Sequence, residues 1–234
     1  MEAAISSRQY AALRAKVVRR ARTRALNEPP RLTVGEEAFN AASHGAGALL
    51  GAAAMAALLG KSQGPLEVLA AWVYGVSMIF MMLASCVYHA MPAGSKAKRV
   101  LRRFDYTSIY LLIGGTFAPI LLVYVGGALG VALFCLQWGV ILFGVTMVAV
   151  FGPGRWRPLH FTLYFLIGWS GLLFLPDFYR NDLPLLSFIL LGGLVYTLGM
   201  IPFARKGKYN HCIWHVFVLA AAALQWVGVY TRIY

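Results

Sequence analysis

The last apolar run of the chain reads HCIWHVFVLAAAALQWVGVY, from His211 to Tyr230. It contains no Lys, Arg, Asp or Glu, and about 20 apolar residues are enough for a helix to cross a bilayer. His211 and His215 open the run at a spacing of i and i+4, which places both side chains on one face of a helix. Such a pair could supply two coordination positions to one metal ion. Because imidazoles inside a membrane segment need polar partners, we expect this face to meet polar groups from other helices.

The composition of the whole chain is that of a membrane protein. Of its 234 residues, 60% are apolar and 12% are charged, whereas charged residues usually make up about a quarter of a soluble domain. Turn residues separate the apolar runs from one another. The sequence therefore predicts an all-α membrane protein, a bundle of seven transmembrane helices that forms one domain at 36–234. The spans are expected near residues 41–60, 66–90, 105–125, 129–150, 158–176, 184–203 and 211–231.

The distribution of positive charge predicts the orientation of the bundle. Of the 21 Lys and Arg residues, 18 lie in the N-terminal tail and in the gaps on the same side, whereas Lys61, Arg180 and Arg232 lie on the other side. Positively charged loops remain in the cytoplasm, so we expect a cytoplasmic N-terminus and an external C-terminus in the cell membrane. Nucleic acid is not expected as a partner, because the positive charge, a net +13 overall, lies in the loops between apolar runs.

Residues 1–35 form a separate basic tail, which we expect in the cytoplasm. Its eight Lys and Arg residues are opposed only by Glu2 and Glu28. The tail lacks the apolar core of a signal peptide, although its Arg-rich, acid-poor composition is also found in organelle transit peptides. Contact with anionic lipid headgroups is the simpler interpretation. Pro29-Pro30 would end any helix in this segment.

Ionisable residues from four of the expected helices reach the same, cytoplasmic side of the membrane. Glu36, Glu37 and His44 open the first run, His89 ends the second, Asp105 opens the third, and His211 and His215 open the seventh. A buried charge without a partner costs several kcal/mol, so these groups must satisfy one another. His89, His211 and His215 would provide three nitrogen ligands, and three protein ligands plus water is the pattern of a catalytic Zn²⁺. Asp105 could then bond the water or orient an imidazole, and Ser85, one turn before His89, could donate to the water or to a substrate carbonyl.

Several of these polar residues could instead have purely structural roles. A histidine near a membrane interface is usually only a hydrogen-bonded group, and this is what we expect of His160. Glu37, Asn40 and His44 share a helix face at i, i+3 and i+7 and could surround the metal ligands, or they could cap their helix and bond to a neighbouring one. Asp105 could simply cap its own helix, where the positive end of the dipole favours a carboxylate.

Four stretches of the chain resemble the motifs of one protein family. They are Glu36-Glu37-x-x-Asn40-x-x-Ser43-His44-Gly45, Ser85-Cys86-Val87-Tyr88-His89, the stretch Asp105–Pro119, and His211-x-x-Trp214-His215-x-Phe217-Val218. They occur in the expected order from about residue 35 to the C-terminus. This arrangement resembles the hemolysin III-like proteins, the bacterial branch of the progestin and adiponectin receptor (PAQR) family.

The resemblance implies a seven-helix fold with a cytoplasmic N-terminus. It also implies that His89, His211 and His215 hold Zn²⁺, with Asp105 and Ser85 close to the water at the metal. It relates the chain to intramembrane metal hydrolases of the alkaline ceramidase type. The family name records a cell-lysing activity, and the bacterial members are linked to membrane lipid and energy homeostasis.

The chain departs from the family pattern at two positions. Tyr106 stands where a histidine is common, and Ala118 stands where a threonine is common. Neither position is a metal ligand in the family, so the prediction of a zinc site is unaffected. We place Tyr106, together with Glu37, Asn40 and His44, around the ligands rather than among them.

Three functions are compatible with these features. The first is a zinc-dependent hydrolase of amide or ester bonds, with membrane lipids as its partners and its substrate. The second is a receptor or membrane-stress sensor in which zinc is a structural clasp between helices. The third is a pore-forming cytolysin. The strong positive-inside pattern argues against it, and so does the lack of an amphipathic stripe that would line a wide channel. The pattern makes no prediction of oligomeric state.

Overall fold

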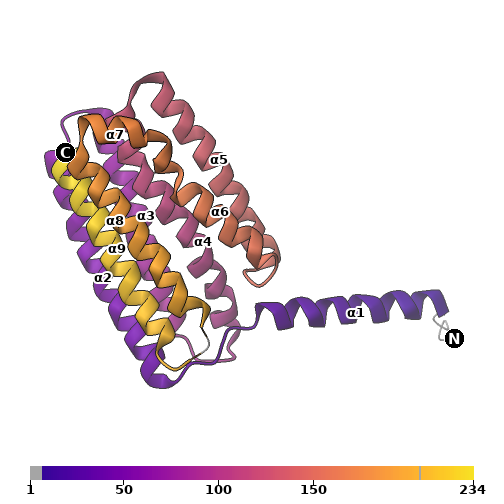
Figure 1. Cartoon of the computed structure of the whole chain (residues 1–234). Coiled ribbons are helices and arrows are strands. Elements are labelled where there is room, and N and C mark those ends of the chain that lie inside the picture. The colour runs from indigo at the N-terminus through magenta and orange to yellow at the C-terminus, as the bar shows by residue number, and fades with distance from the viewer. Residues whose placement is uncertain (1–6, 206) are drawn as a thin grey trace.

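The computed structural model describes residues 7–205 and 207–234 of the chain (Figure 1). In this part of the chain every regular element is a helix, and seven helical spans are long and apolar enough to cross a membrane. Many large apolar side chains on the bundle surface are exposed, such as Leu49, Leu136 and Leu173, which suits contact with lipid rather than water. The prediction of an all-α, seven-helix, multi-pass membrane protein is confirmed.

Within the described residues, a first helix, α1 (Ser7–Asn27), precedes the seven spans. The spans are α2 (Val34–Lys61), α3 (Pro65–Ala90), α4 (Lys96–Pro119) with the π-helix η1 (Ile120–Val125), α5 (Gly127–Phe151), α6 (Arg157–Gly168) with the 3-10 helix η2 (Ser170–Phe174) and α7 (Leu175–Asn181), α8 (Leu183–Ala204), and α9 (Asn210–Arg232). The fifth span is interrupted just before Pro176, which lies in the first turn of α7, where a missing N–H is tolerated.

Polar side chains near three helix ends explain where these helices begin. Thr33 and Glu36 form a reciprocal capping box at the start of α2, and the Ser95 hydroxyl accepts from the backbone N–H of Lys98 at the start of α4. The Asp182 carboxylate accepts from the first turn of α8 in the same way. Each cap satisfies a backbone donor that would otherwise have no partner inside its helix.

Two spans start earlier than the sequence predicts, and one alternative for Asp105 is therefore wrong. The first span begins at Val34 rather than near residue 41, and the third begins at Lys96 rather than near residue 105. Asp105 consequently lies inside α4 and does not cap it, because Ser95 holds that position. The expected start was late because the first turns of α4 carry charged residues, including Lys98 and Arg102, that a hydropathy criterion assigns to a loop.

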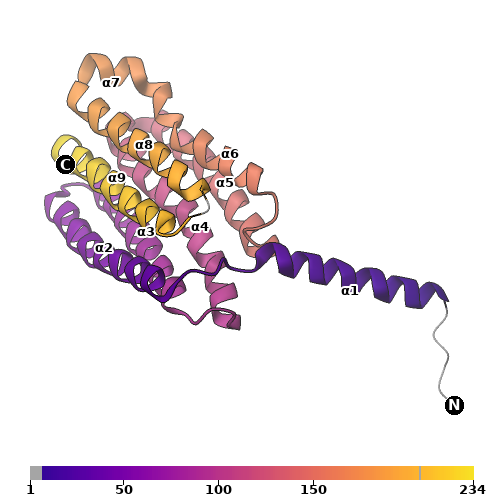
Figure 2. The same cartoon turned by 60° about the horizontal axis from the view of Figure 1, so that its bottom comes forward.

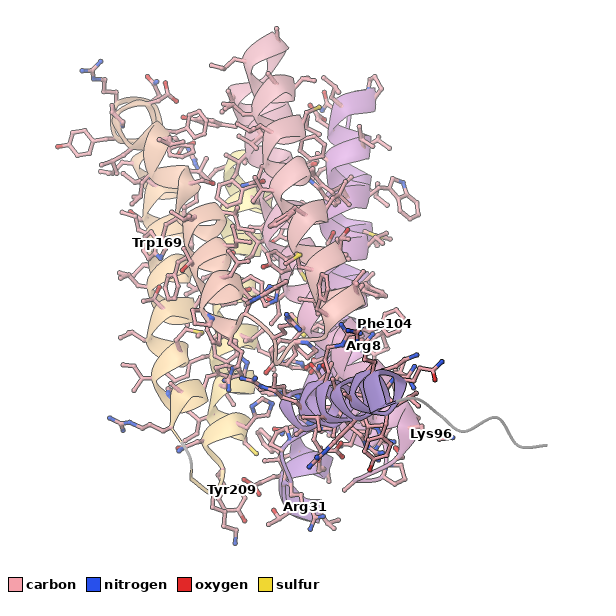
Figure 3. All side chains as sticks on the ribbon, turned by 90° about the vertical axis from the view of Figure 1, so that its right-hand side faces the viewer. Arg8, Arg31, Lys96, Phe104, Trp169 and Tyr209 are labelled. Atoms are coloured by element: carbon pink, nitrogen blue, oxygen red, sulfur yellow. The ribbon has the colours of Figure 1, made fainter. Side chains whose placement is uncertain are left out.

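The spans are arranged so that α3 and α4 are the most buried (Figures 1 and 2). Helix α2 packs against α3 and α9, α8 packs against α9, and α5 and α6 pack on the outer side of α4. A core of Tyr74, Met78, Met82 and Val218 fills the space between α2, α3 and α9. This packing brings the end of α3 and the starts of α2, α4 and α9 to one end of the bundle, the lower end in Figure 3, where Lys96 and Tyr209 are labelled.

Candidate metal centre

Two histidines of the site are positioned by the start of α9. His211 and His215 lie one turn apart in the first two turns of this helix. The chain enters α9 through Tyr209, which has the left-handed backbone angles φ 65° and ψ −3°. The Tyr209 N–H donates to the Glu36 carboxylate of α2 at 2.7 Å. Helix α2 therefore determines where α9 begins, and with it the direction in which the two imidazoles point.

His89, at the end of α3, meets this face of α9. Its Nε2 atom lies 3.3 Å from the Nε2 atom of His211. The centroid of the His215 ring lies 4.9 Å from the His89 centroid and 4.9 Å from the His211 centroid. One nitrogen from each of the three rings lies within 4.8 Å of the other two, so the group could hold a metal ion.

The orientation of His89 is set by a carboxylate on its other side. The Glu37 Oε2 atom lies 2.7 Å from His89 Nδ1, so the imidazole donates its Nδ1–H to α2 and turns Nε2 towards His211. The Glu37 Oε1 atom lies 2.8 Å from the Lys98 ammonium. A carboxylate that fixes the tautomer and direction of a ligating histidine is common behind metal sites. These contacts favour His89 Nε2 as a metal ligand.

Lys98 is the residue that reasoning from the sequence missed. Its side chain is only 1% exposed, although the sequence places it among the cations of a loop. The ammonium donates to the carbonyls of Tyr88 and Met91 at 3.3 and 3.0 Å, in addition to its ion pair with Glu37. Lys98, Arg102 and Asp105 share a helix face at i, i+4 and i+7. That spacing could have indicated that Lys98 faces the site. It is informative only if the helix is known to start before residue 98.

Asp105 and Ser85 lie on the cavity side of the histidines. Ser85 is buried on α3, one turn before His89, and its side chain interacts with the Asp105 carboxylate from α4. Asp105 is only partly shielded because it lines an internal cavity, together with Ser85, His211 and His215. An acceptor carboxylate, a hydroxyl and two of the three imidazoles thus face one space.

The other residues expected near the ligands occupy different positions around them. His44 of α2 stacks on His215 with ring centroids 3.8 Å apart, and Asn40, one turn earlier, is fully buried. Tyr106 lines the cavity, and its ring contacts the Arg102 guanidinium at 5.3 Å. His44 therefore supports a ligand ring directly, whereas Tyr106 is directed at the neighbouring turn of its own helix.

His160 lies in a different part of the bundle. It is buried near the start of α6, and its Nδ1 atom is 2.9 Å from the hydroxyl of Tyr110 on α4. It does not belong to the group of possible metal ligands found in the described part of the chain. His160 therefore provides a buried membrane histidine for comparison with the three at the site.

A cavity of about 150 Å³ extends from the histidines into the apolar interior. It lies between α3, α4, α6, α8 and α9, and reaches Gln225, three turns beyond His215 on α9. Most of its walls are aromatic or aliphatic. Phe161 of α6 and Phe203 of α8 both line it and contact each other edge to face, with ring centroids 6.0 Å apart. The polar groups are concentrated at the histidine end, which suits a molecule with one polar and one apolar part.

Comparison with known proteins agrees with this architecture. Residues 32–226 match the model of the family described as "Haemolysin-III related". The chain is 34% identical over 201 residues to Hemolysin-3 of Bacillus cereus, covering 84% of this chain and 91% of that protein. It is 32% identical over 196 residues to the Hemolysin-3 homolog of Bacillus subtilis (strain 168), covering 82% and 91%. It is 26% identical over 174 residues to the human monocyte to macrophage differentiation factor, covering 72% of each. The resemblance found in the four motifs is thereby confirmed, and the chain, a multi-pass protein of the cell membrane, belongs to the haemolysin-III related family within the wider PAQR family.

Proposed function

We propose that the protein is a zinc-dependent hydrolase of amide or ester bonds in membrane lipids. One observation carries the proposal. Three histidine nitrogens lie within 4.8 Å of one another at the end of a largely apolar cavity that Asp105 and Ser85 also line. Water-activating groups and space for an apolar chain therefore meet at one point.

Zinc fits the donor set. Zn²⁺ binds imidazole nitrogens at about 2.0–2.1 Å with tetrahedral geometry, which separates two such nitrogens by about 3.4 Å. The 3.3 Å between the Nε2 atoms of His89 and His211 is close to that value. Three protein ligands leave one position for water or substrate, as in catalytic zinc sites. Bound Zn²⁺ would supply a Lewis acid and make a water nucleophilic near neutral pH.

The residues around the cavity would each have a separate role in the reaction. Asp105 accepts the proton of the attacking water and returns it to the leaving nitrogen or oxygen. One water is consumed, the carbonyl carbon gains a hydroxyl group, and an amine or alcohol departs. The Ser85 hydroxyl donates to the substrate carbonyl oxygen, on which negative charge develops. Glu37 keeps His89 in the ligating tautomer throughout, because its Oε2 atom accepts a hydrogen bond from Nδ1–H, with Nδ1 and Oε2 2.7 Å apart.

The substrate class follows from the walls of the cavity. Met81, Ile109, Phe165 and Met200 are among the apolar side chains beyond the histidines, and they would shield a hydrocarbon chain from polar groups. The carbonyl would lie near Ser85 and Asp105. We expect lipids with a single acyl chain joined through an amide or ester, such as ceramide-like lipids or lysolipids.

The test combines metal analysis with turnover. Purified wild-type protein should contain about one zinc per chain and should hydrolyse ceramide-like or lysolipid substrates in mixed micelles. His211→Ala should lose both metal and activity. Asp105→Asn should keep the metal and lose at least about 100-fold in kcat, because general acid–base catalysis contributes roughly 10²–10⁴-fold.

His160→Ala is the matched control, since it removes a buried membrane histidine outside the site. It should retain the zinc and the activity. Full activity in His211→Ala would contradict the proposal, and so would an Asp105→Asn enzyme that turns over at the wild-type rate.

One observation favours a second function, in which the metal is a structural clasp of a membrane sensor. The candidate ligands come from α3 and α9, which are distant in sequence, so a bound ion would tie these helices together. In that case zinc raises the temperature of unfolding, no lipid is hydrolysed, and Asp105→Asn behaves like wild type. The two functions therefore differ in the response to Asp105→Asn.

A further inference from the structure

Helix α1 is outside the region that matches the family and has no role in the site. Between Ser7 and Asn27 it carries seven Lys and Arg residues and no acidic residue. The family match begins only at residue 32. Apart from a few half-buried positions near its end, the described side chains of α1 are exposed. A helix with this charge density attracts anionic partners outside the bundle.

The C-terminal end of α1 is fastened to the bundle. Asn27 donates through Nδ2 to the Phe151 carbonyl at 3.0 Å, and accepts through Oδ1 from the Gly154 N–H at 2.9 Å. The Glu28 carbonyl accepts from Arg102 of α4 at 3.0 Å. These contacts involve the loop between α5 and α6 and the start of α4, so α1 leaves the bundle at the end that carries the histidine site.

The direction of α1 is across the bundle, not along it. It extends sideways from the bundle in Figures 1 and 2, and in Figure 3 it is seen nearly end-on while the spans are seen along their length. A span crosses the membrane, so an element that extends sideways from the spans, near the end where they leave the membrane, runs along the membrane surface.

The sequence of α1 is also suited to a membrane surface. Tyr10, Leu13 and Val17 share a face at i, i+3 and i+7, and are 65%, 51% and 65% exposed. Arg8, Arg19 and Arg22 lie on the opposite side, and Arg14 and Lys16 lie at the borders of the apolar face. Arg20 and Arg24 follow the stripe on the same face, seven residues after Leu13 and Val17, and their long side chains can reach outward to headgroups while their methylene groups stay among apolar atoms. An apolar stripe beside a cationic face is the pattern of an interfacial helix.

We propose that α1 lies on the surface of the membrane that the bundle crosses and binds anionic phospholipid headgroups there. The tether at Asn27 keeps the helix at headgroup level, so binding requires no search in solution and the effective lipid concentration is high. A nucleic acid would satisfy the cations equally, but it would leave the Tyr10, Leu13 and Val17 stripe in water. The tether and the stripe therefore both favour lipid.

Hydrogen–deuterium exchange of the full chain in lipid nanodiscs tests the proposal. Discs of zwitterionic phosphatidylcholine would be compared with discs that contain about 30% phosphatidylglycerol. We expect the backbone amides of residues 8–26 to exchange at least roughly tenfold more slowly in the anionic discs, because each cation near such a surface is attracted to it. The difference should disappear in about 1 M salt, where the Debye length is only about 3 Å.

Two triple variants with the same change of charge separate α1 from the rest of the surface. Arg8→Gln/Arg19→Gln/Arg22→Gln should lose most of the slowing. The control Arg157→Gln/Arg205→Gln/Lys208→Gln, in exposed positions at the same end of the bundle, should keep it. Equal exchange of wild-type α1 in the two bilayers would overturn the proposal. Stronger slowing by tRNA in zwitterionic discs than by the anionic bilayer would also overturn it, in favour of nucleic acid.

Discussion

At the scale of single residues, the most consequential side chain is Glu37. Its two oxygens bind different groups, the His89 imidazole at 2.7 Å and the Lys98 ammonium at 2.8 Å. Lys98 is almost completely buried, and its remaining donors reach backbone carbonyls at the end of α3. The carboxylate is thus held by a cation on one side while it orients a candidate metal ligand on the other. Both tasks depend on the pair remaining intact.

Removing Lys98 should destabilise the fold. Lys98→Met would leave the Glu37 carboxylate without its counter-ion, and breaking a buried pair in this way costs about 3–5 kcal/mol of unfolding free energy. Chemical denaturation in mixed micelles measures the change. Lys96→Met is the matched control, since Lys96 is exposed two residues away, and it should stay within about 0.5 kcal/mol of wild type.

The double variant Lys98→Met/Glu37→Gln makes this prediction specific to the pair. It should recover a large part of the loss, because no unpaired charge then remains. The single variant Glu37→Gln completes the cycle. If the loss of unfolding free energy in the double variant equals the sum of the losses in Lys98→Met and Glu37→Gln, the two side chains are not coupled and the interpretation is wrong.

At the scale of elements, the outer helix α5 is joined to α4 through a glycine. The Tyr110 ring of α4 packs directly over Gly144, so a Cβ at this position would overlap the ring. Tyr110 is fully buried, and its hydroxyl is hydrogen-bonded to His160 of α6, so the ring cannot move aside freely. Gly139, on the same helix, has open space where its Cβ would be. One glycine is therefore required by packing and the other is not.

This difference predicts opposite effects of the same substitution. Gly144→Ala should destabilise the protein by about 1–3 kcal/mol, because overpacking forces Tyr110 or α5 to shift. Gly139→Ala should be neutral, or stabilising by up to about 1 kcal/mol through helix propensity. Thermal unfolding of both variants in the same detergent provides the comparison. A Gly144→Ala protein as stable as Gly139→Ala would show that α5 does not pack on α4 in this way.

At the scale of the whole molecule, two groups of helices meet at the histidine end. Helices α2, α3 and α4 form one continuous packed series, and α8 and α9 form another, which contacts the first mainly through α2. Glu36 fastens the start of α9 at this end, and Lys61 of α2 donates to the Tyr230 carbonyl at the other end. A metal held by His89 and the two histidines of α9 would add a direct tie between α3 and α9.

Removal of the metal should therefore lower the stability of the whole bundle. With free metal at about 1,000 times Kd, binding contributes about 4 kcal/mol to unfolding free energy, which corresponds to roughly 8–16 °C in Tm for a domain of this size. Thermal scans with and without a chelator measure the shift. His89→Ala should unfold at the same temperature with or without chelator, and a wild-type protein insensitive to metal would show that the histidines bind none.

The orientation of the bundle remains a prediction from charge. With 18 of the 21 Lys and Arg residues on the side of the N-terminal tail, that side is expected in the cytoplasm. A protease added to inverted membrane vesicles should remove an N-terminal epitope tag and spare a C-terminal one, and sealed right-side-out vesicles should give the reverse. Loss of the N-terminal tag in right-side-out vesicles would refute the orientation.

The sequence by itself determined the number of spans and the pairing of His211 with His215. Both are local properties. An apolar run long enough to cross the bilayer must form a helix there so that its backbone N–H and C=O groups are hydrogen-bonded, and residues at i and i+4 of a helix always lie on the same face. The start of α4 was not predictable in this way. Lys98 is tolerated inside a helix only because Glu37 of another helix neutralises it, and the cost of burying a charge depends on its partner.

Only the tertiary structure decided which helix faces meet. The contact of His89 with His211, the stacking of His44 on His215, and the cavity beside Asp105 depend on how α2, α3, α4 and α9 are rotated about their axes. Rotation is set by packing between side chains far apart in sequence, such as Tyr74 and Val218 in the core. Such packing leaves no signal in any one segment of the sequence. The length of an apolar run, in contrast, can be read directly from the sequence.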